Sequence, residues 1–247
     1  MLLENKVALI TGITRGIGRA IAECFAAHGA RVAGVYNSSE EKAREVERAL
    51  EAQGRLVKLY KGNVADAAFA ATTVDDLVAT CGRIDILVNN AGITRDGFVM
   101  RLSDEQWREV FDTNFGGTFN FTHSALPHFQ AQVQGNVINI VSVTGVLGRE
   151  AQVNYGTTKG AIMGLTRLLA RQHSPHGIRF NLLAPGMIET EMLAHVPPDR
   201  VENFVKHTAM QRLGTASEVA QVAAFLASEL SNYVSTTALR VDGGFLR

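Results

Sequence analysis

Short runs of apolar and β-branched residues alternate along the chain with longer amphipathic segments. Seven runs have the length and composition of strands: Val7–Thr11, Arg31–Tyr36, Leu56–Gly62, Ile84–Asn89, Asn136–Val141, Ile178–Leu183 and Ala238–Val241. Apolar residues recur at helical spacing between them, in Gly16–His28, Glu40–Gln53, Ala67–Cys81, Trp107–Gln130, Val153–Arg171 and Ser217–Glu229. Since parallel strands need crossover connections, this alternation predicts an α/β fold with a doubly wound parallel sheet of about seven strands and helices on both faces.

The 247 residues, 46% of them apolar, are enough to form one substantial core. We expect a single domain over residues 1–247, without an internal repeat or an interdomain linker. The longest stretch without a predicted element runs from Ala184 to about Asp199 and is rich in proline. Long loops in compact domains are often functional, so a substrate lid is expected around residues 187–210.

Charge and composition exclude several classes of protein. Lys plus Arg and Asp plus Glu both number 24, so the chain lacks the basic field that nucleic-acid binding requires. No apolar run is long enough to span a bilayer, and the first residues lack the pattern of a secretory signal. The seven His and two Cys do not have metal-ligand spacing. We therefore expect a cytoplasmic protein that binds neither nucleic acid nor membrane and holds no metal.

A glycine-rich turn, Thr11–Gly18, follows the first predicted strand and leads directly into a helix. Glycines permit a tight turn and a close approach of pyrophosphate to the backbone, and a helix N-terminus attracts anions. The placement indicates a Rossmann-type dinucleotide site, although a glycine turn after a strand also has a purely structural interpretation. The cofactor-binding candidates in the turn are Gly12, Thr14, Arg15, Gly16, Ile17 and Gly18.

The end of the second predicted strand, Tyr36–Ser39, has no acidic residue to bind the ribose hydroxyls of NAD. Arg15 and Asn37 can instead hold a 2′-phosphate by charge-assisted hydrogen bonds. We therefore expect NADPH (NADP) to be preferred over NADH. Two alternatives stay open: Arg15 can be a solvated loop charge, and Glu40 or Glu41 can reach the ribose.

Tyr155 and Lys159 stand four residues apart at the start of a predicted helix, which places both side chains on one face. Lowering the pKa of a tyrosine from about 10 to neutrality needs roughly 4 kcal/mol. One ammonium at about 4 Å is worth roughly that at an effective dielectric near 20, and an oxidised nicotinamide would add a second positive charge. The pair is thus predicted to form an acid–base catalyst, although most such pairs only pack or face solvent.

Ser142 strengthens the catalytic interpretation through its position. It follows the predicted strand Asn136–Val141, at the carboxyl end where ligands bind in sheets of this kind, and it precedes Tyr155 by a short loop. A hydroxyl at this point can donate a hydrogen bond to a carbonyl oxygen. Taken alone, Ser142 would be interpreted as a helix cap or a turn residue.

In combination these motifs resemble the short-chain dehydrogenase/reductase family over the whole length of the chain. The matching positions, in family order, are the glycine turn, Asn89-Asn90-Ala91-Gly92, Asn114, Ser142, Tyr155 with Lys159, and Pro185-Gly186. The resemblance implies that Tyr155 donates a proton to a carbonyl oxygen that Ser142 orients. It also implies that Lys159 binds the nicotinamide ribose and tunes Tyr155, while Asn114 holds a water in a proton relay.

Further cofactor contacts are also implied by the resemblance. Asn63 and Val64 would meet the adenine, and Asn90, Ala91 and Gly92 would line the cofactor cleft. Pro185 and Gly186, with Ile188 and Thr190, would lie at the nicotinamide carboxamide. The structural alternative for Asn114 and for the Asn-Asn-Ala-Gly run is that they close turns and brace neighbouring strands.

Within the family, three stretches are similar to 3-oxoacyl-[acyl-carrier-protein] reductases and acetoacetyl-CoA reductases: Ala91–Asp96, Gln152 to Tyr155, and Pro185–Thr190. The implied reaction is reduction of a 3-oxoacyl thioester, with Ser142, Gln152 and Met187 lining the substrate. Relatives acting on a polyketide, quinone, sugar or alicyclic ketone share several of these markers, so another ketone remains an alternative.

Two departures from the subgroup pattern stand out. The basic residues expected for docking an acidic acyl carrier protein are missing from Ala131–Asn136 and Ser174–Gly177. This leaves Arg101, Arg167, Arg171 and Arg179 as substitutes, or indicates coenzyme A, a specialised carrier protein or a free ketone. In addition, Tyr233–Thr236 stands where relatives have a Thr-Gly pair, and loss of that glycine is expected to alter the local backbone.

Members of this family are usually tetramers built through the helices predicted at Trp107–Gln130 and Val153–Arg171, so a homotetramer is expected. A third interpretation is a non-catalytic dinucleotide-binding subunit of a hetero-oligomer. The intact set of Asn114, Ser142, Tyr155 and Lys159 argues against this interpretation, since such a subunit has no chemical need for all four.

Overall fold

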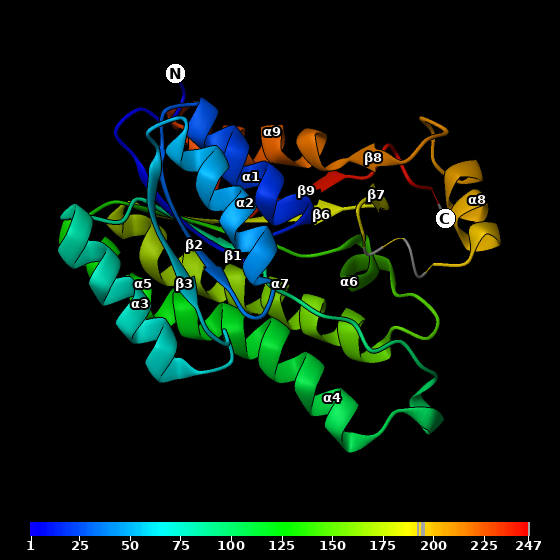
Figure 1. Cartoon of the computed structure of the whole chain (residues 1–247). Coiled ribbons are helices and arrows are strands. Elements are labelled where there is room, and N and C mark those ends of the chain that lie inside the picture. Colours follow the sequence, from blue (N-terminus) through cyan, green and yellow to red (C-terminus); the bar gives the residue numbers. More distant parts are fainter. Residues whose placement is uncertain (192, 194–195, 247) are drawn as a thin grey trace.

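In the computed structural model, which describes residues 1–191, 193 and 196–246, seven strands form one parallel sheet in the order β3-β2-β1-β4-β5-β6-β9 (Figure 1). The strands are β1 (Val7–Thr11), β2 (Arg31–Tyr36), β3 (Leu56–Lys61), β4 (Ile86–Asn89), β5 (Gly135–Ile140), β6 (Ile178–Pro185) and β9 (Ala238–Val241). The predicted single-domain type of fold, a doubly wound parallel sheet, is confirmed. Strand order reverses between β1 and β4, so a crevice is expected at their carboxyl ends.

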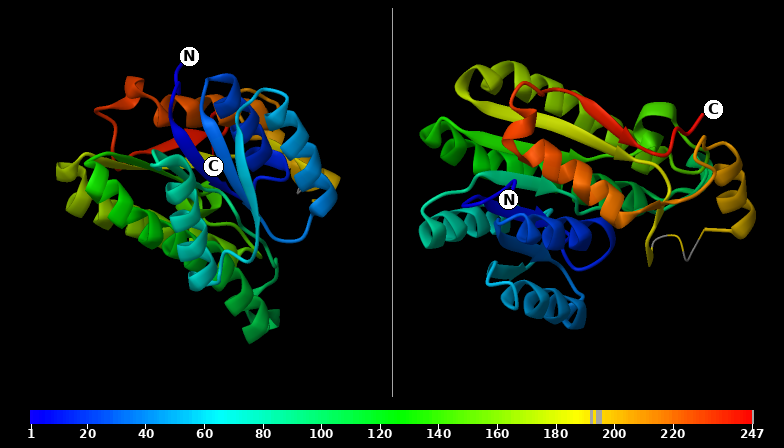
Figure 2. Two further views of the ribbon diagram at one scale, coloured as in Figure 1. Left: turned by 60° about the vertical axis from the view of Figure 1, so that its left-hand side comes forward. Right: turned by 90° about the horizontal axis from the view of Figure 1, so that it is seen from above.

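Helices cover both faces of the sheet, as the left view of Figure 2 shows. One layer contains α1, α2 and α9, and the other contains α3, α5 and α7. Their bounds are α1 (Gly16–Ala27), α2 (Glu40–Glu51), α3 (Ala67–Cys81), α5 (Gly117–Gln132), α7 (Val153–His173) and α9 (Ala216–Ala227).

The period-two geometry of β1 divides the core into two layers. Ala8 and Ile10 pack toward α1 and α9, whereas Val7 and Leu9 pack toward α3 and α5. All four side chains are buried. A strand that is apolar on both faces in this way is typical of a parallel sheet covered by helices on each side.

The segment Trp107–Gln130, predicted as one helix, is instead divided. Helix α4 (Asp104–Phe111) passes through a π-helical turn, Asp112–Gly116, into α5. Such π-turns are rare and frequently mark functional sites. Here the turn contains Asn114, which is fully buried. The apolar periodicity runs through the π-turn without a break, so it did not reveal the extra residue.

The stretch from Ala184 to Asp199 contains more regular structure than was predicted. β6 continues to Pro185, a two-residue strand β7 (Ile188–Glu189) pairs in parallel with β8 (Gly214–Thr215), and α8 (Pro198–Lys206) begins at a proline. The expected lid at 187–210 includes Met192, Ala194 and His195, which lie outside the described residues.

The C-terminal segment, red in Figure 1, runs beside α8. The rings of Phe204 in α8 and Phe245 stack with centroids 4.4 Å apart and planes at 8°. Main-chain hydrogen bonds also join Leu246 to His207 and Met210 to Gly243. The C-terminus therefore fastens the helix that covers the carboxyl ends of β6 and β9. Within the described residues, none of the helices is long and apolar enough to cross a membrane.

Candidate active site

The glycine turn after β1 forms a cradle that side chains would fill. Gly12 and Gly16 adopt left-handed φ angles of 70° and 52°, which only glycine adopts without strain. A Cβ atom on Gly18 would lie 2.2 Å from the carbonyl oxygen of Gly12. Helix α1 begins here with no side-chain cap and no acidic residue in its first turn. Its first N–H groups are therefore suited to bind the pyrophosphate of a dinucleotide, and the residues fit this group.

The Asn90–Gly92 run lies directly against this turn. The Nδ2 atom of Asn90 donates to the carbonyl oxygens of Thr11 and Gly12, at 3.0 and 3.1 Å. The Thr11 hydroxyl oxygen accepts from the backbone N–H groups of Asn90 and Ala91, both at 3.0 Å. β1 and β4 are thus tied together at the switch point of the sheet. Thr11 was not foreseen as a site residue, since its only signal was a threonine at the last position of a strand.

The residues expected at the adenine end lie where the loops after β2 and β3 begin. Asn37 and Asn63 are exposed. Val64 is buried, and its carbonyl oxygen accepts a hydrogen bond from Nδ2 of Asn120 at 3.1 Å. Arg15 is exposed and has Glu191 as an ionic partner at 3.8 Å. The structure therefore leaves the polar groups of Asn37, Asn63 and Arg15 accessible at one edge of the sheet.

At the other end of the crevice, the segment after β6 approaches the glycine turn. A Cβ atom on Gly16 would lie 3.3 Å from Cγ2 of Thr190. Met187 and Ile188 are buried, and Gly186 has no room for a side chain because a Cβ atom on it would lie 2.7 Å from Cβ of Asp242. The segment Pro185–Thr190 therefore closes the crevice opposite Asn90–Gly92.

Tyr155 and Lys159 lie on one face of α7, as their spacing predicted. The Nζ atom of Lys159 is 5.5 Å from the centroid of the Tyr155 ring and donates to the carbonyl oxygen of Ile140 at 2.8 Å. Lys159 is only 4% exposed. A Cβ atom on Gly92 would be 3.6 Å from this Nζ. The ammonium therefore points into the crevice between β4 and β5.

Ser142 begins the short helix α6 (Val143–Leu147) immediately after β5. Its Oγ atom accepts a hydrogen bond from the backbone N–H of Thr144 at 3.1 Å, so it is a helix cap. It also bonds the Tyr155 side chain, an interaction that lowers the pKa of the phenol. Ser142 thus fills the structural role foreseen for it and lies beside the phenol as well.

Burial sets the protonation of the catalytic pair in the protein alone. It raises the pKa of Tyr155 to about 12, with Ser142 opposing the shift and the Asp96 carboxylate adding to it. Burial also lowers the pKa of Lys159 to about 8. The lowering of the Tyr155 pKa that was expected from Lys159 and an oxidised nicotinamide together is therefore not seen in the protein alone. Desolvation penalises both charged forms, and it dominates here.

The carboxamide of Asn114 is fully engaged with protein groups. Its Oδ1 accepts from the N–H of Ile93 at 2.8 Å, and its Nδ2 donates to the carbonyl oxygen of Ile93 at 3.0 Å and to Oγ1 of Thr158 at 3.2 Å. Thr158 precedes Lys159 on α7. Asn114 therefore connects the loop after β4 to the helix that carries the catalytic pair.

Gln152 is held between two polar side chains at the start of α7. Its Nε2 donates to Asp96 at 2.9 Å, and its Oε1 accepts from Oγ1 of Thr144 at 3.2 Å. Asn154 was not foreseen: its Nδ2 donates to the carbonyl oxygen of Arg95 at 2.9 Å and its Oδ1 accepts from the backbone N–H of Tyr155 at 2.7 Å. These bonds fix the first turn of α7 against the loop after β4.

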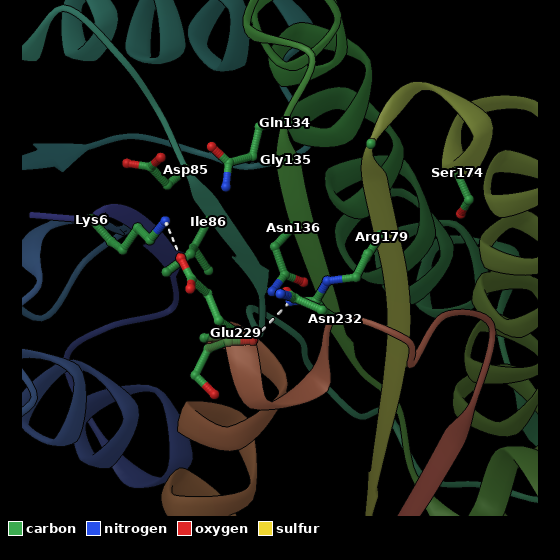
Figure 3. Close-up of a pocket in the computed structure, with 13 residues that line it drawn as sticks. Lys6, Asp85, Ile86, Gln134, Gly135, Asn136, Ser174, Arg179, Glu229 and Asn232 are labelled. Atoms are coloured by element: carbon green, nitrogen blue, oxygen red, sulfur yellow. Dashed lines mark hydrogen bonds and ion pairs between the residues drawn. The ribbon is translucent and has the colours of Figure 1, made fainter. Parts of the chain in front are cut away.

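A separate polar cavity of about 200 Å³ lies at the opposite, amino-terminal edge of the sheet (Figure 3). None of the predicted catalytic or cofactor-binding residues lines it. Arg179 lines it and donates through Nη1 and Nη2 to Leu226 O, Ser228 O, Val234 O and Ser231 Oγ. Because these bonds hold the guanidinium against the end of α9, Arg179 is not available to dock a carrier protein.

Comparisons with known proteins agree with this geometry. A family model described as enoyl-(acyl carrier protein) reductase matches residues 12–246. The chain is 40% identical over 244 residues to 3-oxoacyl-[acyl-carrier-protein] reductase FabG of Escherichia coli K12, covering 99% of this chain and 98% of that protein. It is 39% identical over 240 residues to the reductase of the same name from Staphylococcus aureus Mu50, covering 97% and 98% respectively.

Proposed function

The chain belongs to the short-chain dehydrogenase/reductase family, and we propose that it reduces a 3-oxoacyl thioester to the 3-hydroxyacyl thioester with NADPH. It is an NAD(P)-dependent oxidoreductase similar to 3-oxoacyl-[acyl-carrier-protein] reductases. The observation that carries the proposal is the convergence of Ser142, Tyr155 and Lys159 at the carboxyl end of β5, beside the glycine cradle.

Tyr155 is the proton donor in this reaction. With a pKa of about 12 its phenol is protonated at neutral pH, so it is ready to act as an acid. A nicotinamide held by Lys159 and the segment Pro185–Thr190 would supply the hydride that the carbonyl carbon of the substrate accepts. As the carbonyl oxygen gains negative charge, Tyr155 transfers its phenolic proton to that oxygen.

Lys159 and Ser142 support this transfer. The Lys159 ammonium stabilises the phenolate that Tyr155 becomes, and it binds the hydroxyls of the nicotinamide ribose. The Ser142 hydroxyl, which lies beside the Tyr155 phenol, orients the carbonyl oxygen. The Asn114 carboxamide is engaged with Ile93 and Thr158. Its backbone carbonyl oxygen accepts from Oγ1 of Thr118 at 2.7 Å and has a second lone pair that would hold a relay water.

The chain's own residues also support the choice of NADPH. No acidic residue stands at the end of β2 to bind the ribose hydroxyls of NAD, and Arg15 stands beside the cradle. Asn37, Asn63 and Val64 serve the adenosine half. The segment Pro185–Thr190 serves the nicotinamide, and Gln152 with Met187 lines the substrate. A substrate lid is proposed around residues 187–210, of which 192, 194 and 195 lie outside the described residues.

Exposed apolar side chains on the α4, α5 and α7 face support assembly as a homotetramer. Trp107, Phe119 and Leu168 are 36%, 46% and 64% exposed, and burying them between subunits is favourable. Light scattering on the purified protein measures the mass directly. A monomeric mass would contradict this part of the proposal.

The reaction is tested by following NADPH oxidation with acetoacetyl-CoA, an acetoacetyl carrier protein and a panel of simple ketones that includes a quinone and an alicyclic ketone. Turnover on either thioester, above that on the panel, supports the proposal, and the ratio of the two thioesters identifies the carrier. Turnover confined to the panel would replace the thioester by another ketone. Binding of NADPH with no turnover on any substrate would indicate a non-catalytic subunit.

A further inference from the structure

Three charged side chains from distant parts of the chain meet beside the glycine cradle. Arg15 lies in the loop before α1, Lys42 in the first turn of α2, and Glu191 in the loop after β7. One Glu191 carboxylate oxygen lies 3.8 Å from Nη1 of Arg15, and the other accepts a hydrogen bond from Nζ of Lys42. The hydrogen bond from the Lys42 ammonium is the main reason that the pKa of Glu191 lies below its usual range, and the Arg15 charge lowers it further.

Neighbouring charges do not explain why Glu191 contacts both Arg15 and Lys42. Glu40, on the same turn of α2, is paired with Lys61 at 2.6 Å. Arg19, on the first turn of α1, is paired with Glu23 and Glu45, each at 2.8 Å. The ends of α1 and α2 therefore satisfy their other charges locally. Arg15 and Lys42 instead share the carboxylate of Glu191, which belongs to the loop at the nicotinamide end of the crevice.

We propose that Glu191 takes the place of the cofactor's 2′-phosphate on Arg15 and Lys42, and that Lys42 is a second cation that selects NADPH. This inference rests on the proposed function. A phosphate monoester carries about 1.5 to 2 negative charges at neutral pH, whereas a carboxylate carries one. Two cations therefore favour the phosphate, which displaces Glu191 when NADPH binds. NADH has no such group and leaves Glu191 on its two partners.

Displacement of Glu191 also concerns the loop that carries it. Thr190, the preceding residue, lies against Gly16 of the cradle, where a Cβ would be 3.3 Å from its Cγ2 atom. The ion pairs of Glu191 thus hold Thr190 and Glu191 beside the cradle. Replacement of these pairs by the 2′-phosphate releases Glu191 as the cofactor enters, so that phosphate recognition and the position of these two residues are coupled.

The test measures equilibrium binding rather than activity. The probes are adenosine 2′,5′-bisphosphate and 5′-AMP, which differ only in the 2′-phosphate, followed by NADPH and NADH, all by isothermal titration calorimetry. Lys42→Met is expected to weaken adenosine 2′,5′-bisphosphate and NADPH by about tenfold. Glu191→Gln is expected to tighten both by about threefold. 5′-AMP and NADH should change less than twofold in either variant.

The double variant and a control complete the design. If Glu191 acts through Lys42, the tightening by Glu191→Gln shrinks in the Lys42→Met background. Lys58→Met breaks an exposed Lys58–Asp76 pair of 2.9 Å elsewhere and should leave all four affinities unchanged. If Glu191→Gln changed the NADPH and NADH affinities equally, Glu191 would act only by steric obstruction, and the inference would be overturned. An unchanged NADPH affinity in Lys42→Met would also overturn it. Failure of the wild-type protein to bind either dinucleotide would instead overturn the proposed function.

Discussion

Asn114 and Ile93 are joined by two hydrogen bonds in which the carboxamide both accepts from and donates to the same backbone residue, at 2.8 and 3.0 Å. This pairing locks the loop after β4 onto the π-turn between α4 and α5. The third bond, to Thr158, extends the lock to α7. We therefore call Asn114 a brace, because it fixes the loop after β4 relative to the catalytic helix α7.

Replacing Asn114 by Ala should lower the free energy of unfolding by about 2 kcal/mol, because it leaves partly buried backbone groups of Ile93 unpaired. It should also lower turnover at least tenfold at a temperature where the variant is still folded. Denaturant unfolding and steady-state kinetics measure the two effects. Asn136→Ala is the matched control, since Asn136 is buried at the opposite edge of the sheet and bonds Leu226. A variant of Asn114 with full turnover would contradict the brace.

Tyr155→Phe should reduce turnover by about a thousandfold, the size typical of losing a general acid. Cofactor affinity should change less than twofold, because the ring and the Lys159 position are kept. NADPH binding followed by fluorescence, together with the rate of NADPH oxidation, separates these quantities. Tyr60→Phe is the control: this phenol bonds Asp76 of α3 and none of the site residues, so its loss should leave turnover intact. Retained turnover in Tyr155→Phe would exclude the mechanism.

The lowered pKa of Lys159, about 8, makes a prediction about stability and pH. In the unfolded chain the lysine titrates near its usual value of about 10.4. Between these values the unfolded state binds more protons, so Lys159 destabilises the fold below pH 8 and this cost is relieved as the pH rises. Compared with Lys159→Met, wild type should gain about 2 to 3 kcal/mol of stability between pH 7 and pH 10.

Urea unfolding of both proteins at several pH values gives this difference, in which other titrating groups cancel. A difference that stays constant, or one that changes with the opposite sign, would show that Lys159 is not desolvated. In both proteins the raised pKa of Tyr155 lowers stability from about pH 10 upward, so the comparison is made below that pH.

Thr236 adopts a left-handed φ of 65°. This is the region where relatives were expected to have glycine, and a β-branched residue there is strained. Thr236 therefore holds, at a cost, a conformation that glycine adopts freely. Thr236→Gly should raise the free energy of unfolding by about 0.5 to 1 kcal/mol. Thr237→Gly, whose φ is not in this region, should lower it, and a loss of stability in both variants would refute the strain.

The sequence alone was sufficient for the order of the seven sheet strands along the chain and for the prediction of which residues form the site. The seven strands follow from local runs of apolar residues, and their ends deviate by one or two residues. Tyr155 and Lys159 share a face because helical spacing is a local property. The glycine cradle follows from positions where only glycine fits, and the family follows from the order of these motifs.

Tertiary structure alone decided the rest, because it depends on contacts between residues far apart in the chain. The π-turn at Asn114 is stabilised by Ile93 and Thr158, which no periodicity around residue 114 reveals. The directions of the Tyr155 and Lys159 pKa shifts depend on burial by surrounding elements, which reversed the expected effect on the phenol. Glu191 reaches Lys42 across 149 positions of sequence only because the loops after β6 and β2 end at the same edge of the sheet.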